Sequence, residues 1–188
     1  MKKKMLAMLF AVLMLAGCGT AEKEPEAEFT SKADQMIAYL QEVPAEVTPE
    51  QAVANDFYTI KDQKALNQPI WDSFMAKVEQ DTETSVMVCQ YSMKDGAVLD
   101  FVTYYEGGFF EVVTDTTRDG YNDEKSVMRA PETYTALHVF ENFVLQEGGR
   151  EYTICTLSDD PDLTADDFRE YWINMTMDDH GVQLLYVI

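Results

Sequence analysis

The segment 115–124 contains the residue types and spacing of a candidate cation-binding loop. Its Asp, Thr, Asp and Gly at the first, third, fifth and sixth positions match part of a calcium loop. Asp115, Asp119 and Asp123 would supply the carboxylate oxygens. Calcium takes six to eight oxygen ligands, and a short acidic loop provides several of them together. One hypothesis is therefore a calcium-stabilised loop.

Two features of the same segment favour a different interpretation. The twelfth position is Ser126, where a calcium loop has a bidentate Glu, and a predicted strand rather than a helix precedes the loop. Arg118 lies among the acids and would pair with Asp115 or Asp119 to brace a solvated turn. Both interpretations stay open at the level of the sequence.

Five aromatic residues gather around a glycine turn and the loop that follows it. They are Tyr104, Tyr105, Phe109, Phe110 and Tyr121. Adjacent residues of a strand face opposite sides of a sheet, so one member of each adjacent pair would be exposed. Exposed rings could stack on a sugar, a peptide or another small molecule, whereas a sheet covered on both faces would make them core residues. These residues are the candidate ligand-binding surface.

Residues that could perform catalysis are sparse. The conceivable nucleophile pair is Cys89 with His138, which would indicate a hydrolase if the fold brought both into one cleft. The sequence has no Gly-x-Ser-x-Gly, His-Glu-x-x-His, Cys-x-x-Cys or phosphate-binding glycine loop. We therefore expect a protein that is not an enzyme, with no catalytic residues and no cofactor other than a candidate Ca²⁺.

The first residues of the chain predict export. Three lysines at positions 2–4 precede an uninterrupted apolar run over 5–16, and small residues follow, which is the pattern of a secretory signal. The apolar run is too short to cross a bilayer, which takes about 20 residues.

The end of this signal predicts lipidation. Leu15-Ala16-Gly17-Cys18 resembles the lipobox of bacterial lipoproteins. The resemblance implies that 1–17 is a signal peptide and that Cys18 carries the lipid. Residues 18–30 would then be the lipidated cysteine with a flexible polar tether. Several acyl chains hold a protein stably at a membrane, so we expect a lipid anchor at the extracytoplasmic face of the cell membrane.

Composition bounds the remaining chain. The chain has 188 residues, of which 46% are apolar. This length and apolar content are sufficient for one hydrophobic core, so we expect a single domain over 31–188. The formal net charge is −20, and such an acidic surface repels nucleic acid, so we expect no nucleic-acid partner. Cys89 and Cys155 form an even pair in an exported chain, which fits either one disulfide or two buried thiols.

Hydrophobic periodicity predicts an α+β domain. Helices are expected at about 31–43, from 48, at 67–78 and from 164, and strands at about 57–60, 85–93, 97–105, 109–116, 134–146, 150–157 and 182–188. Glycine-containing turns join these strands into a three-stranded meander and a second hairpin. We therefore expect a mainly antiparallel sheet of about five to six strands with helices packed on one face.

Four short motifs occur in order between Pro49 and Leu157. They are Pro49-Glu50-Gln51-Ala52-Val53 at a helix start, Asp95-Gly96 between strands, Asp115-Thr116-Thr117-Arg118-Asp119 after a strand, and Tyr152-Thr153-Ile154-Cys155 in the last hairpin. Together they resemble a domain-of-unknown-function family of small lipoproteins from Gram-positive bacteria. The resemblance implies this location and fold and supplies no activity.

These observations predict a membrane-anchored extracytoplasmic binding or interaction module. Its ligand would be a protein, a glycan or a small molecule, held on a sheet face or by the loop 118–131. The alternatives are a calcium-stabilised structural domain and, third, a hydrolase.

Overall fold

The computed structural model describes residues 31–91, 96–120, 125–127 and 130–188. Within these ranges the chain forms two sheets. The larger sheet has the order β2-β1-β3-β4-β5-β6, made of β1 (Tyr58–Lys61), β2 (Lys64–Ala65), β3 (Thr84–Tyr91), β4 (Ala97–Tyr105), β5 (Phe109–Asp115) and β6 (Glu132–Tyr134). Neighbouring strands are antiparallel except β1 and β3, which are parallel. The smaller sheet is antiparallel and consists of β7 (Ala136–Val144), β8 (Glu151–Ser158) and β9 (Val182–Val187).

Three of the four α-helices in the described residues begin at capping residues in the sequence. The α-helices are α1 (Lys32–Glu42), α2 (Pro49–Ala54), α3 (Gln68–Val78) and α4 (Ala165–Asn174), followed by the short 3₁₀ helix η1 (Asp178–His180). Ser31, Thr48 and Thr164 each form a capping box with the side chain three residues later. These reciprocal hydrogen bonds satisfy amides that have no partner inside the helix, and they fix the start of each helix.

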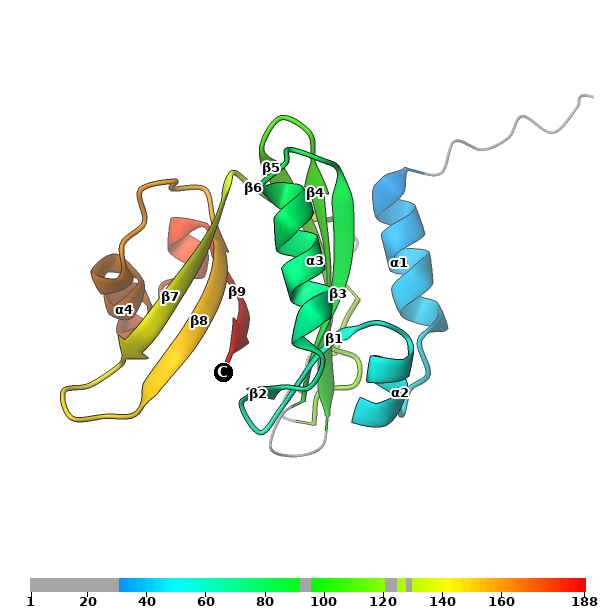
Figure 1. The fold of residues 1–188 in the computed structure, drawn as a ribbon, viewed down its shortest axis with the longest axis horizontal. Coiled ribbons are helices and arrows are strands. Elements are labelled where there is room, and N and C mark those ends of the chain that lie inside the picture. The colour runs from blue at the N-terminus through cyan, green and yellow to red at the C-terminus, as the bar shows by residue number, and fades with distance from the viewer. Residues whose placement is uncertain (1–30, 92–95, 121–124, 128–129) are drawn as a thin grey trace, which may run out of the picture.

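Both faces of the larger sheet are covered, as Figure 1 shows. Alternation along β3 directs Val86 and Val88 into a core with α3 and the smaller sheet. The same alternation directs Met87 and Cys89 into a second core with α1 and α2. The α+β class with mainly antiparallel pairing is thus confirmed. Helices on both faces, rather than the single face we expected, follow from the apolar character of both side-chain sets of β3.

The smaller sheet forms a further layer between the larger sheet and α4 (Figure 1). Cys155 and Leu157 of β8 face the larger sheet and are fully buried. Ile154 faces the other way, into a third core with Phe143 and Phe168. A strand with apolar residues on both sides therefore holds two cores together.

The strand predicted over 134–146 is divided between the two sheets. Tyr134 ends β6, and the chain crosses at Thr135 into β7, where the Thr135 amide donates to the Ser158 carbonyl at 3.1 Å. The extended conformation expected for this segment is confirmed. The hydrophobic pattern of the sequence did not reveal that the segment changes from one sheet to the other. In the part of the chain that the structure describes, no helix has the length and hydrophobicity needed to span a membrane.

Candidate functional site

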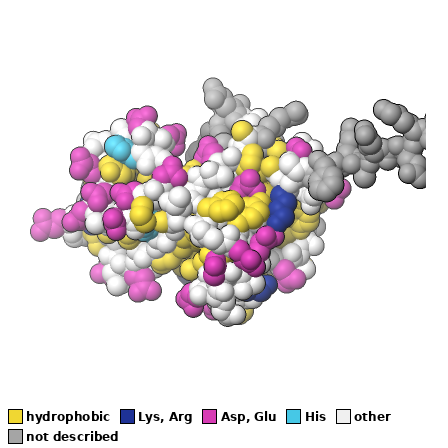
Figure 2. Space-filling model, turned by 90° about the horizontal axis from the view of Figure 1, so that it is seen from above, with side chains coloured by type: hydrophobic (Ala, Val, Ile, Leu, Met, Phe, Trp, Pro, Cys, Tyr) yellow, Lys and Arg dark blue, Asp and Glu magenta, His cyan; other side chains and the backbone are white. Residues whose placement is uncertain are grey.

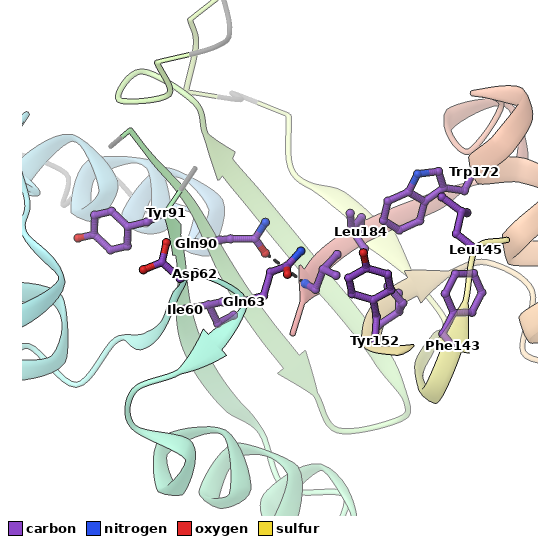
Figure 3. Close-up of a pocket in the computed structure, with 12 residues that line it drawn as sticks. Ile60, Asp62, Gln63, Gln90, Tyr91, Phe143, Leu145, Tyr152, Trp172 and Leu184 are labelled. Atoms are coloured by element: carbon purple, nitrogen blue, oxygen red, sulfur yellow. Dashed lines mark hydrogen bonds between the residues drawn. The ribbon is translucent and has the colours of Figure 1, made fainter. Parts of the chain in front are cut away.

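A cleft of about 600 Å³ opens between the two sheets, beside the β1–β2 turn of the larger sheet. The larger sheet contributes the β1–β2 turn and the end of β3, and the smaller sheet contributes all three of its strands (Figure 3). Helix α4 adds Trp172. The volume lies within the range of sites that bind small molecules.

Most of the cleft wall is apolar. Its apolar lining residues are Ile60, Phe143, Leu145, Tyr152, Ile154, Trp172, Leu184 and Val187. Phe143 and Ile154 are buried and form the floor, because they belong to the core between the smaller sheet and α4. Tyr152, Leu184 and Trp172 are half-buried above them. Figure 3 shows Phe143, Leu145, Tyr152, Trp172 and Leu184 grouped on the same side of the cleft. The wall therefore offers aromatic and aliphatic surface to a ligand.

Polar groups come from the opposite side, on the larger sheet. Asp62 and Gln63 form the two-residue β1–β2 turn, and both have positive φ, 51° and 57°. Two consecutive residues with this conformation match the twist of a hairpin. The turn places both side chains at the rim of the cleft.

Two glutamines present amide groups to the cleft. Gln90 Oε1 accepts from the Val187 amide at 3.3 Å (Figure 3), and Gln63 Oε1 accepts from Arg150 Nη1 at 2.5 Å. Arg150 also lies 5.5 Å above the Tyr152 ring, so it connects the β1–β2 turn to the β7–β8 turn. Each amide nitrogen makes no hydrogen bond within the described residues. Both are donors that a ligand oxygen could accept from.

Tyr91 lines the far end of the cleft and is turned away from it. Its hydroxyl donates to the Val47 carbonyl at 2.8 Å, and Figure 3 shows the ring pointing away from the other labelled residues. Burial raises the pKa of Tyr91, so the hydroxyl stays a donor at neutral pH.

The segment 115–120 is fixed by an arginine. Asp115 is fully buried, its Oδ2 pairs with Arg118, and its Oδ1 accepts from the Thr117 amide at 2.8 Å and hydroxyl at 2.5 Å. The pairing of Arg118 with Asp115 that we gave as the alternative to metal binding is therefore observed. Asp123 lies outside the described residues, so the calcium site stays a prediction. Among the described residues no group of three potential metal ligands converges.

The aromatic pairs alternate as expected along their strands. Tyr104 and Phe110 are buried in the core beneath α3, whereas Phe109 is 40% exposed. Tyr105 and Phe109 stack with their ring centroids 4.6 Å apart, and Lys32 Nζ lies 4.8 Å from the Tyr105 centroid. The predicted surface thus reduces to one stacked pair, and Tyr121 lies outside the described residues.

Cys89 and His138 are not brought together. Cys89 is buried against α1 and α2, on the face of the larger sheet that is turned away from the smaller sheet. The His138 ring contacts the Asp160 carbonyl at 3.0 Å in the smaller sheet. Burial raises the pKa of Cys89 to about 12, so its thiol is protonated and unreactive. Cys89 and Cys155 are both free, which settles their pairing in favour of two buried thiols.

Asp100 is a second buried carboxyl outside the cleft, besides Asp115. Asp100 is 3% exposed in β4, and the Thr114 hydroxyl donates to its Oδ1 at 2.6 Å. Burial raises the pKa of Asp100 to about 7, an effect that the Thr114 hydrogen bond partly offsets. Among the described residues no lysine or arginine forms an ion pair with it.

The cleft residues were not predicted from the sequence. Trp172 belongs to an amphipathic helix stripe, a pattern that indicates core packing, and Gln63 and Gln90 carry no recognisable motif. Comparisons with protein-family models, curated proteins and solved structures found no significant match to this chain. The resemblance to a lipoprotein family and the lipobox at Cys18, which lies outside the described residues, accordingly stay predictions.

Proposed function

We propose that this chain is a lipid-anchored extracytoplasmic binding module that holds a small molecule in the cleft between its two sheets. The observation that carries the proposal is a cleft of about 600 Å³ with aromatic walls and two amide donors that make no hydrogen bond to any described residue. Sites for small molecules combine apolar walls with a few placed polar groups in this manner.

The chemistry of the walls defines the ligand class. Trp172, Tyr152 and Leu184 suit an aromatic or aliphatic body, and the amides of Gln63 and Gln90 suit carbonyl, ether or hydroxyl oxygens. Asp62 at the rim and a net charge of −20 disfavour an anion. Figure 2 shows acidic side chains spread over the face in view. The ligand is therefore neutral or cationic, mainly apolar, and bears oxygen acceptors.

A neutral fluorescent probe, Nile red, tests the cleft. The soluble 19–188 chain suffices, because every described core residue lies within 36–188. Leu184→Trp fills the cleft and should weaken binding by at least about tenfold, which corresponds to 1.4 kcal/mol. The matched control is Val139→Trp, because Val139 is 41% exposed on β7 and does not line the cleft.

Fluorescence titration supplies the affinity and the stoichiometry, and circular dichroism checks that both variants are folded. One site per chain that Leu184→Trp removes and Val139→Trp retains is the expected result. Equal binding by the two variants would show that the probe binds elsewhere and would refute the cleft as the site.

Anchoring is tested independently at Cys18. Full-length protein expressed in a bacterium should sediment with membranes and be released only by detergent, because stable anchoring requires covalently attached acyl chains. Cys18→Ser removes the thiol that accepts the lipid, so it should abolish the incorporation of a labelled fatty acid that the wild-type protein shows. Labelling that survives in Cys18→Ser, or a wild-type protein that incorporates no label, would contradict the anchor.

A further inference from the structure

The first half of β3 has an open edge. β1 pairs with β3 only from Tyr58 opposite Val88 to Ile60 opposite Gln90. Before Tyr58 the chain turns away into α2, with the Phe57 amide bonded to the Ala52 carbonyl at 3.0 Å. Among the described residues, 84–87 therefore have no strand neighbour on the side of β1. An open edge of this kind exposes backbone donors and acceptors.

The pairing of β1 with β3 defines which residue of β3 directs its amide and carbonyl into the open edge. The amide of Thr59 bonds to Asn67 and its carbonyl to Leu66, so both point toward β2. The direction of the backbone amide and carbonyl alternates along a strand, so those of Tyr58 and Ile60 point toward β3. The residues of β3 that direct their backbone groups toward β1 are then Met87 and Cys89, on either side of Val88. Ser85, two residues before Met87, points its backbone groups in the same direction.

The side chain of Ser85 agrees with this assignment. Its Oγ lies 2.9 Å from Thr103 Oγ1 on β4, and such close side chains are typical of a pair that is not hydrogen-bonded through its backbone. Ser85 is also exposed, although the residues on either side of it are buried. The amide and carbonyl of Ser85 therefore point into the open edge.

A groove of about 390 Å³ runs along this edge. On one face α1 contributes Tyr39, which is 44% exposed and packs 5.6 Å from the Phe101 ring. On the other face α3 contributes Ile70 and Ser73. The groove thus has side chains of α1 and α3 on its two faces and, among the described residues, backbone groups of Ser85 without a strand partner at its floor.

We propose that this groove binds an extended segment of a partner protein, which adds to the larger sheet as a strand beside 84–87. Addition of a strand uses main-chain hydrogen bonds for affinity and alternate side chains for specificity. Side chains of a strand alternate between the two faces, so the apolar side chains of the segment would contact Ile70 on the α3 face. The alternate side chains would lie on the α1 face beside Tyr39, opposite Lys77 of α3, and basic residues there suit a chain of net charge −20. A second copy of this chain is disfavoured as occupant, because two such acidic chains repel each other.

The test uses a synthetic nine-residue peptide in which valine alternates with lysine or threonine. Binding to the 19–188 chain is measured by fluorescence anisotropy, and amide protection by hydrogen exchange with NMR detection. Ser85→Pro removes the outward N–H, and proline is tolerated where a strand amide faces solvent. It should weaken binding by at least about tenfold, the equivalent of 1.4 kcal/mol. Ser85→Ala keeps the amide and should bind within about twofold of wild type.

A second variant keeps the test valid if Ser85→Pro unfolds the protein. Ser73→Trp lies on the exposed surface of α3 and blocks the groove without altering the sheet. It should abolish binding, as should alternate N-methylation of the peptide backbone, and Leu184→Trp in the cleft should have no effect. Peptide binding that survives Ser73→Trp and leaves the Ser85 amide unprotected would overturn the proposal. Sedimentation that shows a Ser85-dependent dimer would overturn it in favour of self-association.

Discussion

Replacing Asp115 by alanine should lower the free energy of unfolding by about 3–5 kcal/mol, because it leaves the partner charge buried and uncompensated. The side chains of Asp115 and Arg118 are 1% and 7% exposed. Arg118 also donates to the carbonyl of Leu40, in the last turn of α1, and to those of Val43 and Pro44, which follow that helix. The loss of Asp115 would therefore loosen the attachment of α1 to the end of β5. Urea unfolding at neutral pH measures the change.

The matched control is Asp166→Ala. Asp166 also forms an ion pair with an arginine three residues away, but its side chain is 88% exposed. Exposed pairs of this kind contribute about 1 kcal/mol at most, because solvent screens them. A loss for Asp115→Ala no greater than that for Asp166→Ala would show that the buried pair does not hold α1 in place.

Asp100→Asn should remove a pH dependence that the wild-type protein shows. Burial raises the pKa of Asp100 to about 7, from an ordinary value of 3.8. Between these values the folded state binds more protons than the unfolded state, so stability falls as pH rises. The contribution of Asp100 is fully retained below pH 3.8 and is lost progressively up to about pH 7. The total loss is about 4 kcal/mol, since each pKa unit corresponds to 1.36 kcal/mol.

The difference in unfolding free energy between wild type and Asp100→Asn isolates this effect. The other carboxyls titrate alike in both proteins, so their contributions cancel in the difference. Urea unfolding at several pH values from 4 to 8 should show the advantage of wild type declining up to about pH 7 and then levelling off. A difference that is constant with pH would mean that Asp100 titrates normally in the folded protein.

Local features of the fold could be predicted from the sequence because local chemistry determines them. Ser31, Thr48 and Thr164 start helices through hydrogen bonds to residues three positions away. Gly107 and Gly108 adopt positive φ at the predicted turn between β4 and β5, where a side chain would be strained. The expected strands and their antiparallel pairing follow from these turns.

Features that depend on distant segments could not be predicted. The crossing at Thr135 depends on β8, whose Ser158 carbonyl receives the Thr135 amide across 23 residues. The cleft joins residues as far apart as Asp62 and Trp172, and neither has a local signal. The open edge of β3 depends on where β1 begins, and element boundaries are the least certain part of a sequence-based prediction.

The separate burial of Cys89 and Cys155 has a consequence for biogenesis. The two thiols lie in different cores, with the backbone of the larger sheet between them, and a disulfide requires Cα atoms within about 7 Å. An oxidant that joined them in the unfolded chain would prevent both cores from forming together. At the proposed extracytoplasmic location, correct folding therefore requires the chain to bury both thiols before they are oxidised.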